Sequence, residues 1–339
     1  MIINGLRDNH VYPLGSAGYG LRRKDLSRIV ILFTPSACYH RFFSMEKDDI
    51  AIIGTGKVGT ALGFLLKKNG YRITALSDRS QETLRKAAAF IGAEAFLDPS
   101  LAAKPADVIF ITTPDDMIHQ VCHQIAMDGA FRQGQIVVHT SGAMGLDTLS
   151  DANQMGAFRA SIHPIQSFAD IEGALQNIPG STFGITADEN VKDWAIKVVK
   201  DLRGVPLVVL EDEKPLYHAA ACIASNYVTT LLSHVEEIFL SLGLSSEAGR
   251  SAFMPLIRGT LANIENRGSA LALTGPIVRG DTGTILKHLH AFRKYLPHLL
   301  KAYGQLGLLT VEMAVRNERL SPEKGQEIRN ILQEGGIKE

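Results

Sequence analysis

A glycine-rich loop between an apolar strand and an amphipathic helix is the feature that most constrains the fold of this chain. Residues 50–53 are all apolar, as in a buried parallel strand, and glycines follow at positions 54, 56 and 59. Gly54 permits a tight turn, Gly56 lets a phosphate approach the backbone, and Gly59 lets the helix pack closely on a sheet. The loop therefore predicts a strand–turn–helix unit that binds a pyrophosphate at the helix N-terminus.

Strands and helices alternate along the segment that follows this loop. Apolar runs predict strands at residues 50–53, 71–76, 93–97, 108–111, 136–139, 158–162, 182–185 and 206–210. Repeated strand–helix–strand units imply a parallel, doubly wound sheet. The predicted fold class is α/β, with a Rossmann dinucleotide-binding domain over residues 45–210.

Beyond residue 211 only the helical period remains. Helices are predicted at residues 216–242, 248–266, 284–308 and 322–332, with a glycine-containing loop at 274–281. Residues 211–335 should therefore form an all-helical C-terminal domain for substrate binding and dimerisation. A ligand would sit in a cleft at the carboxyl edge of the sheet.

The first 44 residues stand apart from this pattern. They carry six Lys or Arg against two acids and show no clear period beyond one apolar run. We expect a disordered tail or a start placed too early, with Met45 as the true first residue. A targeting segment is the alternative, but the stretch lacks a hydrophobic core and a cleavage site.

Composition narrows the classes of function. With 45% hydrophobic and 21% charged residues and no net charge, the chain resembles an ordinary soluble protein, so we expect neither a nucleic-acid nor a membrane partner. Three widely spaced cysteines fit a reducing cytoplasm. No cluster has metal-ligand spacing, so no metal is expected.

The end of the second predicted strand bears on the choice of cofactor. Asp78, 19 residues after Gly59, would accept hydrogen bonds from a free ribose, whereas Arg79 and Ser80 would hold a 2′-phosphate. The Arg-Ser pair favours NADP, and NAD is the alternative. The fourth strand leads into a predicted helix with Thr113 as its N-cap. The residues expected to contact the cofactor are Gly54, Thr55, Gly56, Lys57, Val58, Gly59, Asp78, Arg79, Ser80, Thr112, Thr113 and Pro114.

Two predicted strands end in polar residues that could take part in a reaction. Ser141 would bond a nicotinamide amide or the substrate, or else cap a turn. His163 would donate a proton or bind substrate, or else only cap its strand.

The first helix after residue 211 carries a third group of candidates. His218, Cys222 and Asn226 are spaced four residues apart and should form one stripe. A histidine can protonate an oxygen that gains a hydride, and an amide can hold a carboxylate; packing is the alternative. In the 274–281 loop, Arg279 and Asp281 are candidate substrate ligands, or parts of a bare surface loop.

Six motifs in one order make the chain resemble a bacterial family that pairs a Rossmann-like domain with a helical domain of unknown function. The likeness covers about residues 48–320. The motifs are the glycine loop, Thr112-Thr-Pro-Asp115, His139-Thr-Ser-Gly-Ala143, His163-Pro-Ile-Gln-Ser-Phe168, Tyr217-His-Ala to Ala-Ser-Asn226, and Thr274-Gly-Pro to Arg-Gly-Asp281. The family is similar to a superfamily that holds 6-phosphogluconate dehydrogenase, pyrroline-5-carboxylate reductase, ketopantoate reductase and prephenate dehydrogenase.

The resemblance implies an NAD(P)-dependent oxidoreductase. Against the ketopantoate reductase pattern, His218 stands where a lysine is the general acid, Cys222 where the first asparagine stands, and Asn226 at the second. His163-Pro164 resembles the His-Pro segment of prephenate dehydrogenases, without the glycine and acid that follow it there. Relatives imply a homodimer formed through the helical domain.

Three functional hypotheses follow. The first is an NADPH-dependent reductase of a small 2-oxo acid, with ketopantoate as the leading candidate. The second is an imine reductase of the pyrroline-5-carboxylate type, which needs an ionised general acid less. The third is a sensor or scaffold that binds NADP(H) without turnover.

Overall fold

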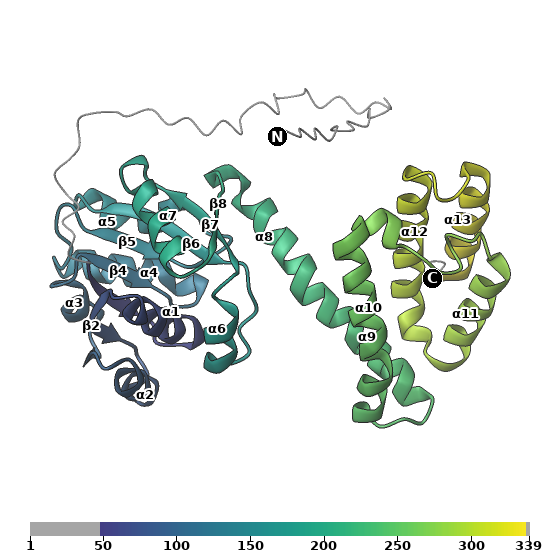
Figure 1. The fold of residues 1–339 in the computed structure, drawn as a ribbon, viewed down its shortest axis with the longest axis horizontal. Coiled ribbons are helices and arrows are strands. Elements are labelled where there is room, and N and C mark those ends of the chain that lie inside the picture. The colour runs from purple at the N-terminus through teal and green to yellow at the C-terminus, as the bar shows by residue number, and fades with distance from the viewer. Residues whose placement is uncertain (1–47, 337–339) are drawn as a thin grey trace, which may run out of the picture. The chain divides into compact units, whose positions relative to one another are not determined.

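The computed structural model describes residues 48–336 of the 339, so the predictions made for residues 1–44 and for Met45 lie outside the described part. Eight strands form one sheet in the order β3-β2-β1-β4-β5-β6-β7-β8 (Figure 1). The strands are β1 (Asp49–Ile53), β2 (Arg72–Ser77), β3 (Glu94–Phe96), β4 (Val108–Ile111), β5 (Ile136–His139), β6 (Phe158–Pro164), β7 (Thr182–Ala187) and β8 (Val205–Val208). The predicted Rossmann architecture is confirmed.

One strand pairing departs from the predicted parallel sheet. The pairs from β3 through β6 are parallel, as is β7 with β8, whereas β7 runs antiparallel to β6, with His163 opposite Gly184. The chain leaves β6 through a short helix, α6 (Ile171–Asn177), and re-enters the sheet at the edge where β6 ends. The start of β7 therefore joins the carboxyl edge of the parallel strands.

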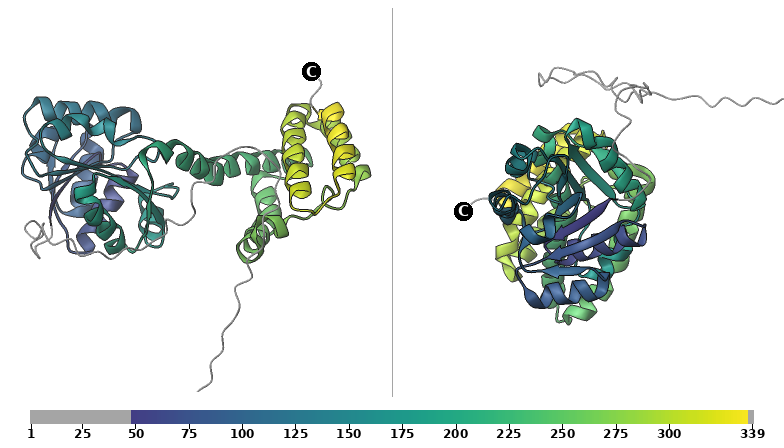
Figure 2. Two further views of the ribbon diagram at one scale, coloured as in Figure 1. Left: turned by 90° about the horizontal axis from the view of Figure 1, so that it is seen from above. Right: turned by 90° about the vertical axis from the view of Figure 1, so that its left-hand side faces the viewer.

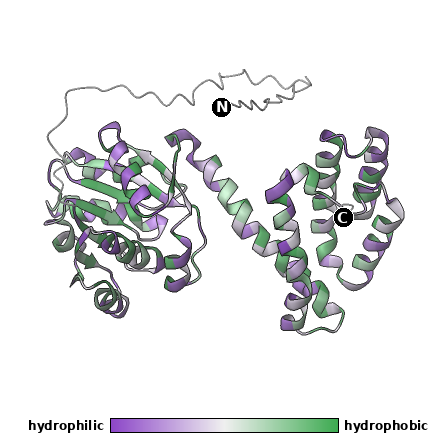
Figure 3. Ribbon diagram, viewed as in Figure 1, coloured by the Kyte–Doolittle hydropathy of each residue, from purple (hydrophilic) through white to green (hydrophobic). Residues whose placement is uncertain are grey.

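Both faces of the sheet are buried, which explains the continuous apolar runs in its strands. Because successive side chains of a strand point to opposite faces, Ile50 and Ile52 enter one core and Ala51 and Ile53 the other. The first core is covered by α1 (Lys57–Lys68), α2 (Gln81–Ile91) and α7 (Lys192–Asp201), and the second by α3 (Pro99–Ala103), α4 (Asp115–Met127) and α5 (Ser150–Gln154). Figure 2 shows this layering from two further directions, and Figure 3 shows the hydrophobic strands within it.

The start of α4 corrects a predicted cap. The sequence suggested Thr113 as the N-cap with Pro114 inside the helix, but α4 begins at Asp115 and Pro114 is the N-cap, in an extended conformation and with no side-chain cap bond. Asp115 and Asp116 lie in the first turn, where acids stabilise the exposed amides. Thr113 is therefore left free of a capping role.

The chain is helical after residue 213, as predicted. The helices are α8 (Lys214–Cys222), a π-helical turn (Ile223–Tyr227), α9 (Val228–Ser241), α10 (Ser246–Ala272), α11 (Thr282–Tyr295), α12 (Leu300–Arg316) and α13 (Pro322–Gly336). The prediction of one helix over 284–308 is wrong. Pro297 has no amide hydrogen to continue the ladder, so α11 ends at Tyr295 and a 3-10 turn at Pro297–Leu299 leads into α12.

The helices of the C-terminal part differ in how much they bury. Helices α11, α12 and α13 share a core that includes Ile285, Leu289, Val311, Ile328 and Leu332. In contrast, α9 has no buried residue, and only Gly249 and Phe253 are buried in α10. Within residues 48–336, no helix has both the length and the hydrophobicity to span a membrane.

Candidate functional site

The glycine loop has the close contacts that its glycines predict. Gly54 has φ +98°, and a Cβ there would lie 2.8 Å from the backbone nitrogen of Thr113. A Cβ at Gly59 would lie 2.1 Å from the Gly54 carbonyl oxygen and 2.4 Å from Thr112 Oγ1. Thr112 in turn donates a hydrogen bond from Oγ1 to the Gly54 carbonyl. The ends of β1 and β4 are thereby packed together around glycine backbone.

The same loop fits a bound pyrophosphate. A Cβ at Gly56 would meet nothing within 4 Å, and Gly56 and Lys57 are exposed. Helix α1 begins without a side-chain cap and without an acid in its first turn, so its amides and dipole are free to meet an anion. Among the described residues, Thr113 Oγ1 is the one buried side-chain polar atom without a hydrogen-bond partner. A ligand at this edge could supply that partner.

Asp78 has a different set of partners from the ribose that the sequence suggested. Its Oδ2 accepts hydrogen bonds from the backbone nitrogen of Thr55 at 2.7 Å and from Thr55 Oγ1 at 3.0 Å. Its Oδ1 accepts one from the backbone nitrogen of Ser80 at 2.9 Å, and Ser80 Oγ caps α2. Oδ2 therefore holds the glycine loop, and Oδ1 holds the turn before α2. Arg79 is exposed and, in the described part of the chain, its side chain has no partner.

Ser141 connects the end of β5 to the start of α4. Its Oγ donates a hydrogen bond to Asp115 Oδ2 at 2.7 Å and accepts bonds from the backbone nitrogens of Ala143 (3.2 Å) and Met144 (3.0 Å). This is the turn-capping alternative for Ser141. Its hydroxyl is already engaged with protein groups.

His139 supports the same turn from inside. Its Nδ1 accepts a hydrogen bond from the backbone nitrogen of Ser141, so Nε2 donates to the carbonyl oxygen of Gly145, both at 3.2 Å. Complete burial disfavours the charged ring and lowers the pKa of His139 to about 3. His139 is thus a neutral structural residue.

Lys214, at the start of α8, is a buried residue that the sequence analysis missed. Its Nζ donates to Ser161 Oγ at 2.8 Å and to the carbonyl oxygen of Ser141 at 3.3 Å. The side chain is 1% exposed, and burial lowers the pKa of Lys214 to about 8 although Glu211 and Asp115 oppose the shift. A lysine four residues before His218 on one helix was the available signal.

The side chains of His163, Tyr217 and His218 are in contact with one another. His163 Nδ1 lies 2.8 Å from the hydroxyl oxygen of Tyr217, and the rings of His163 and His218 are 5.9 Å apart between centroids. A Cβ at Gly142 would lie 2.7 Å from carbons of both histidine rings, and one at Gly184 would lie 2.3 Å from the Tyr217 hydroxyl. Two glycines therefore make the room for the His163–Tyr217–His218 cluster. Tyr217 was not among the predicted site residues.

Burial keeps both His163 and Tyr217 uncharged. Burial, followed by the charges of His218 and Lys214, lowers the pKa of His163 to about 4, so this imidazole is neutral at pH 7. Burial raises the pKa of Tyr217 to about 12, so the phenol keeps its proton. Both groups can donate hydrogen bonds while uncharged.

The π-helical turn alters the predicted stripe of His218, Cys222 and Asn226. Cys222 Sγ lies 3.8 Å from His218 Nδ1, as expected for residues four apart. The turn at Ile223–Tyr227 adds a residue to the helical cycle, and Asn226 lies within it and is exposed. Of the three residues, only His218 and Cys222 are in contact.

The 274–281 loop places its two candidates in different surroundings. Asp281 caps α11, because its carboxylate accepts from the backbone nitrogen of Thr284 at 3.0 Å and from Thr284 Oγ1 at 2.7 Å. Arg279 is exposed, with no side-chain partner within residues 48–336. Asp281 is therefore occupied structurally and Arg279 is free.

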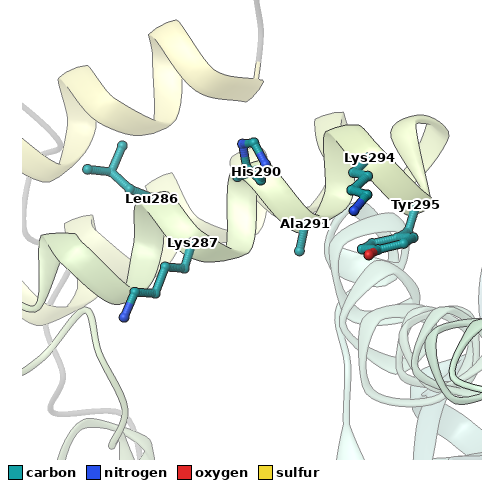
Figure 4. Close-up of a pocket in the computed structure, with 6 residues that line it drawn as sticks. All are labelled: Leu286, Lys287, His290, Ala291, Lys294 and Tyr295. Atoms are coloured by element: carbon teal, nitrogen blue, oxygen red, sulfur yellow. The ribbon is translucent and has the colours of Figure 1, made fainter.

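Two surface hollows lie apart from these residues or only border them. One, of about 400 Å³, is lined by α11 side chains alone, which project from one helix (Figure 4). The other, of about 500 Å³, lies among α1, α2 and α6 and touches the glycine loop only at Thr55. No group of three or more potential metal ligands is present in the described chain.

A line of contacts connects the glycine loop, Ser141, Lys214 and the His163–Tyr217 pair along the carboxyl edge of the sheet. It runs from the glycine loop through Thr112 to α4, from Asp115 to Ser141, from Ser141 to Lys214, and along α8 to Tyr217 and His163. This arrangement can bind a dinucleotide at one end and offer neutral hydrogen-bond donors at the other.

Two family models match this chain. Residues 43–164 match the Rossmann-like domain, and residues 181–310 match a domain of unknown function, DUF2520. The predicted pairing of a Rossmann-like domain with a helical domain of unknown function is confirmed. A comparison with curated proteins finds no match.

Solved structures share the fold. Protein TM1727 from Thermotoga maritima is 27% identical, with a TM-score of 0.63 over 80% of this chain and 100% of its own. Protein BF3122 from Bacteroides fragilis is 21% identical, with a TM-score of 0.65 over 78% and 98%. The pyrroline carboxylate reductase of Plasmodium falciparum, with NADP bound, is 14% identical, with a TM-score of 0.53 over 84% and 100%.

Proposed function

Because the chain pairs a Rossmann-like domain with DUF2520, we propose that it is an NADPH-dependent reductase of a small molecule. The substrate class that we propose is a 2-oxo acid, with ketopantoate as the first compound to test. The observation that carries the proposal is the line of contacts that joins the glycine loop to the His163–Tyr217–His218 cluster.

The proposed cofactor site is built from the loop and Arg79. The amides at the start of α1 would hold the pyrophosphate, and Thr113 Oγ1 would find a partner in the bound dinucleotide. The Asp78 carboxylate is already bonded to Thr55 and Ser80, which leaves Arg79 as the group available to a 2′-phosphate. This favours NADP over NAD. When bound, the cofactor supplies a hydride at the carboxyl edge.

The proposed chemistry at the other end is polarisation and protonation. A substrate oxygen beside His163 would accept a hydrogen bond from a neutral ring, and His218, half-buried on α8, would provide the proton that completes the hydroxyl group. Arg279 is the free cation that we propose for the substrate carboxylate. The pyrroline carboxylate reductase that shares the fold makes imine reduction the second candidate function.

We also propose that the protein is a homodimer formed through α8, α9 and α10. A single chain leaves large apolar side chains exposed there, and a second copy can cover them. They are Leu216, Ile223, Tyr227, Val228, Leu231, Leu240, Leu242, Leu256, Leu261, Ile264 and Leu271, which are 38–78% exposed.

The test is oxidation of NADPH by the purified protein with a panel of 2-oxo acids, cyclic imines and aldehydes. Turnover of a 2-oxo acid supports the proposal, and turnover of imines alone transfers it to the second candidate. Tight NADPH binding without turnover of any member would point to a non-catalytic sensor or scaffold. Failure to bind NADPH or NADH would refute the cofactor assignment.

A further inference from the structure

We infer that Tyr217 and Lys214 are positioning residues that hold His163 as a neutral imidazole, with its Nε2–H as the hydrogen-bond donor to the reacting substrate atom. This rests on the proposed reductase function for its purpose, but not for its geometry. It assigns His163 a role other than that of a charged general acid.

The first step concerns the proton between Tyr217 and His163. Burial raises the pKa of Tyr217 to about 12, so the phenol keeps a proton that it can donate. His163 Nδ1 is the nearest acceptor, at 2.8 Å, whereas the His163 carbonyl oxygen is 3.5 Å away. Nδ1 of a neutral ring can accept this hydrogen bond only if it carries no hydrogen. The ring hydrogen is then on Nε2.

The second step concerns the other nitrogen. Nε2 of His163 has no hydrogen-bond partner in the described part of the chain. If Nε2 were fully buried, it would be a buried polar atom without a partner. In the described part of the chain, Thr113 Oγ1 is the only such atom. Nε2 must therefore be accessible from the surface, whereas Gly142 lies against the Cε1–Nδ1 edge of the ring. A donor fixed in direction and open to a ligand is the arrangement that polarises a carbonyl or imine.

The third step is the charge environment of His163. The rings of His163 and His218 are 5.9 Å apart between centroids, and the buried Lys214 Nζ donates to the neutral oxygens of Ser161 and Ser141. His139 on β5 is neutral, and the carboxylate of Asp115 on α4 is bonded to Ser141. The positive charge near His163 is thus not balanced by a direct ion pair. It opposes protonation of the ring.

The reaction balances with a neutral His163. The substrate carbon accepts the hydride, and the π pair of its double bond moves to the oxygen or nitrogen beside Nε2–H. That atom then takes a proton from His218, and His218 regains a proton from solvent. His163 ends the cycle with the proton it began with.

Nitrogen NMR of the histidine side chains tests the tautomer without a substrate. We expect His163, assigned by the loss of its signals in His163→Gln, to show Nε2–H and no titration between pH 5 and pH 8. In Tyr217→Phe the tautomer preference should be lost and the titration should move to higher pH. Tyr303→Phe is the matched control, because it removes a 2.8 Å tyrosine bond from His288 Nδ1 on α11 and should leave His163 unchanged. A wild-type Nδ1–H tautomer, or a ring that titrates above pH 6, would overturn the inference.

A kinetic measurement separates this inference from the proposed function. Tyr217→Phe should lower kcat roughly ten- to a hundredfold with KM little changed, by analogy with the loss of a group that orients a metal-binding histidine. An unchanged kcat in a working enzyme would refute the positioning role. If no substrate is turned over, the reductase proposal fails, whereas the NMR result still decides the tautomer.

Discussion

Lys214 Nζ and Ser161 Oγ form a 2.8 Å hydrogen bond between residues 53 positions apart in the chain. This bond ties the first turn of α8 to β6, so the helix that carries Tyr217 and His218 is attached to the strand that carries His163. A buried ammonium with only neutral acceptors is a costly way to make such an attachment. The charge of Lys214 also opposes protonation of His163.

Lys214→Met should remove the free-energy cost of burying the ammonium group. It should therefore change how the stability of the protein depends on pH. The pKa of Lys214 is about 8, below that of an exposed lysine, so between pH 8 and about 10.5 the unfolded chain binds a proton that the folded chain does not. Wild-type stability should therefore gain a contribution as pH rises through this window. Urea denaturation at pH 7.5, 9 and 10 should show this gain in the wild type and not in Lys214→Met. Equal pH profiles would contradict the assignment, and Lys214→Arg, which stays charged, should be less stable than either.

Acid should destabilise the protein through His139 and His163. Their pKa values are lowered to about 3 and about 4, so as pH falls below 6.5 the unfolded chain takes up protons that the folded chain does not. The stability present above pH 6.5 is lost progressively down to those values. For the fully buried His139 the loss is on the order of a few kcal/mol. His139→Asn should flatten the fall in urea midpoint between pH 7 and pH 4, and a fall of unchanged steepness would argue against it.

Arg79→Ala should weaken NADPH binding far more than NADH binding. A charge-assisted contact to the 2′-phosphate contributes on the order of 1.5–3 kcal/mol, or roughly ten- to a hundredfold in affinity. Calorimetric titration with both cofactors measures the difference, and Arg329→Ala on α13 is the matched control. Asp78→Asn should weaken both cofactors alike, since it loosens the contact with Thr55. Equal losses in Arg79→Ala would mean that Arg79 does not bind the phosphate.

His218→Ala should lower kcat by roughly a hundredfold while NADPH affinity stays nearly constant, because a positioned proton donor is worth about that much. His163→Gln should also lower kcat, because it removes the proposed hydrogen-bond donor to the substrate. An unchanged kcat in His218→Ala would place the proton donor elsewhere.

Leu256→Asp should convert the proposed dimer to a monomer. Leu256 is 70% exposed on α10 of a single chain, so the change costs the fold of that chain little but would bury a charge in a dimer contact. Light scattering coupled to size exclusion measures the mass. Leu101→Asp, at a site 56% exposed on α3, is the matched control and should leave the mass unchanged. A monomeric wild type would end the dimer proposal.

The sheet was predictable because its signal is local. A strand such as 108–111, buried on both faces, must be apolar throughout, and a loop such as 54–59 cannot carry side chains where backbone meets backbone. The break at Pro297 was visible in the sequence but was outweighed by the apolar period around it. The antiparallel β7 was not predictable, because strand direction depends on how the chain crosses between α6 and β7.

The sequence allowed several residues of the site to be predicted, but not the contacts that they make. His163 and His218 were singled out and do meet, whereas Ser141 and Asp281 bond to neighbouring protein groups. Tyr217 and Lys214 were missed because their roles depend on pairings across 54 and 53 residues of chain. The spacing of Lys214 four residues before His218 marks the lysine as a candidate, but it does not identify its partners on β5 and β6.

The π-helical turn at Ile223–Tyr227 sets the angular phase of one continuous helix from Lys214 to Ser241. Each residue of an α-helix advances the side-chain direction by about 100°, so the one-residue surplus of a π turn rotates everything after it by that amount. Deleting a single residue within 223–227 would keep almost the same composition and the same helix. It would also swing the apolar side chains after Tyr227 about a quarter-turn away from their present bearing relative to His218. The one extra residue of the π turn therefore fixes the direction of His218 relative to the apolar side chains after Tyr227.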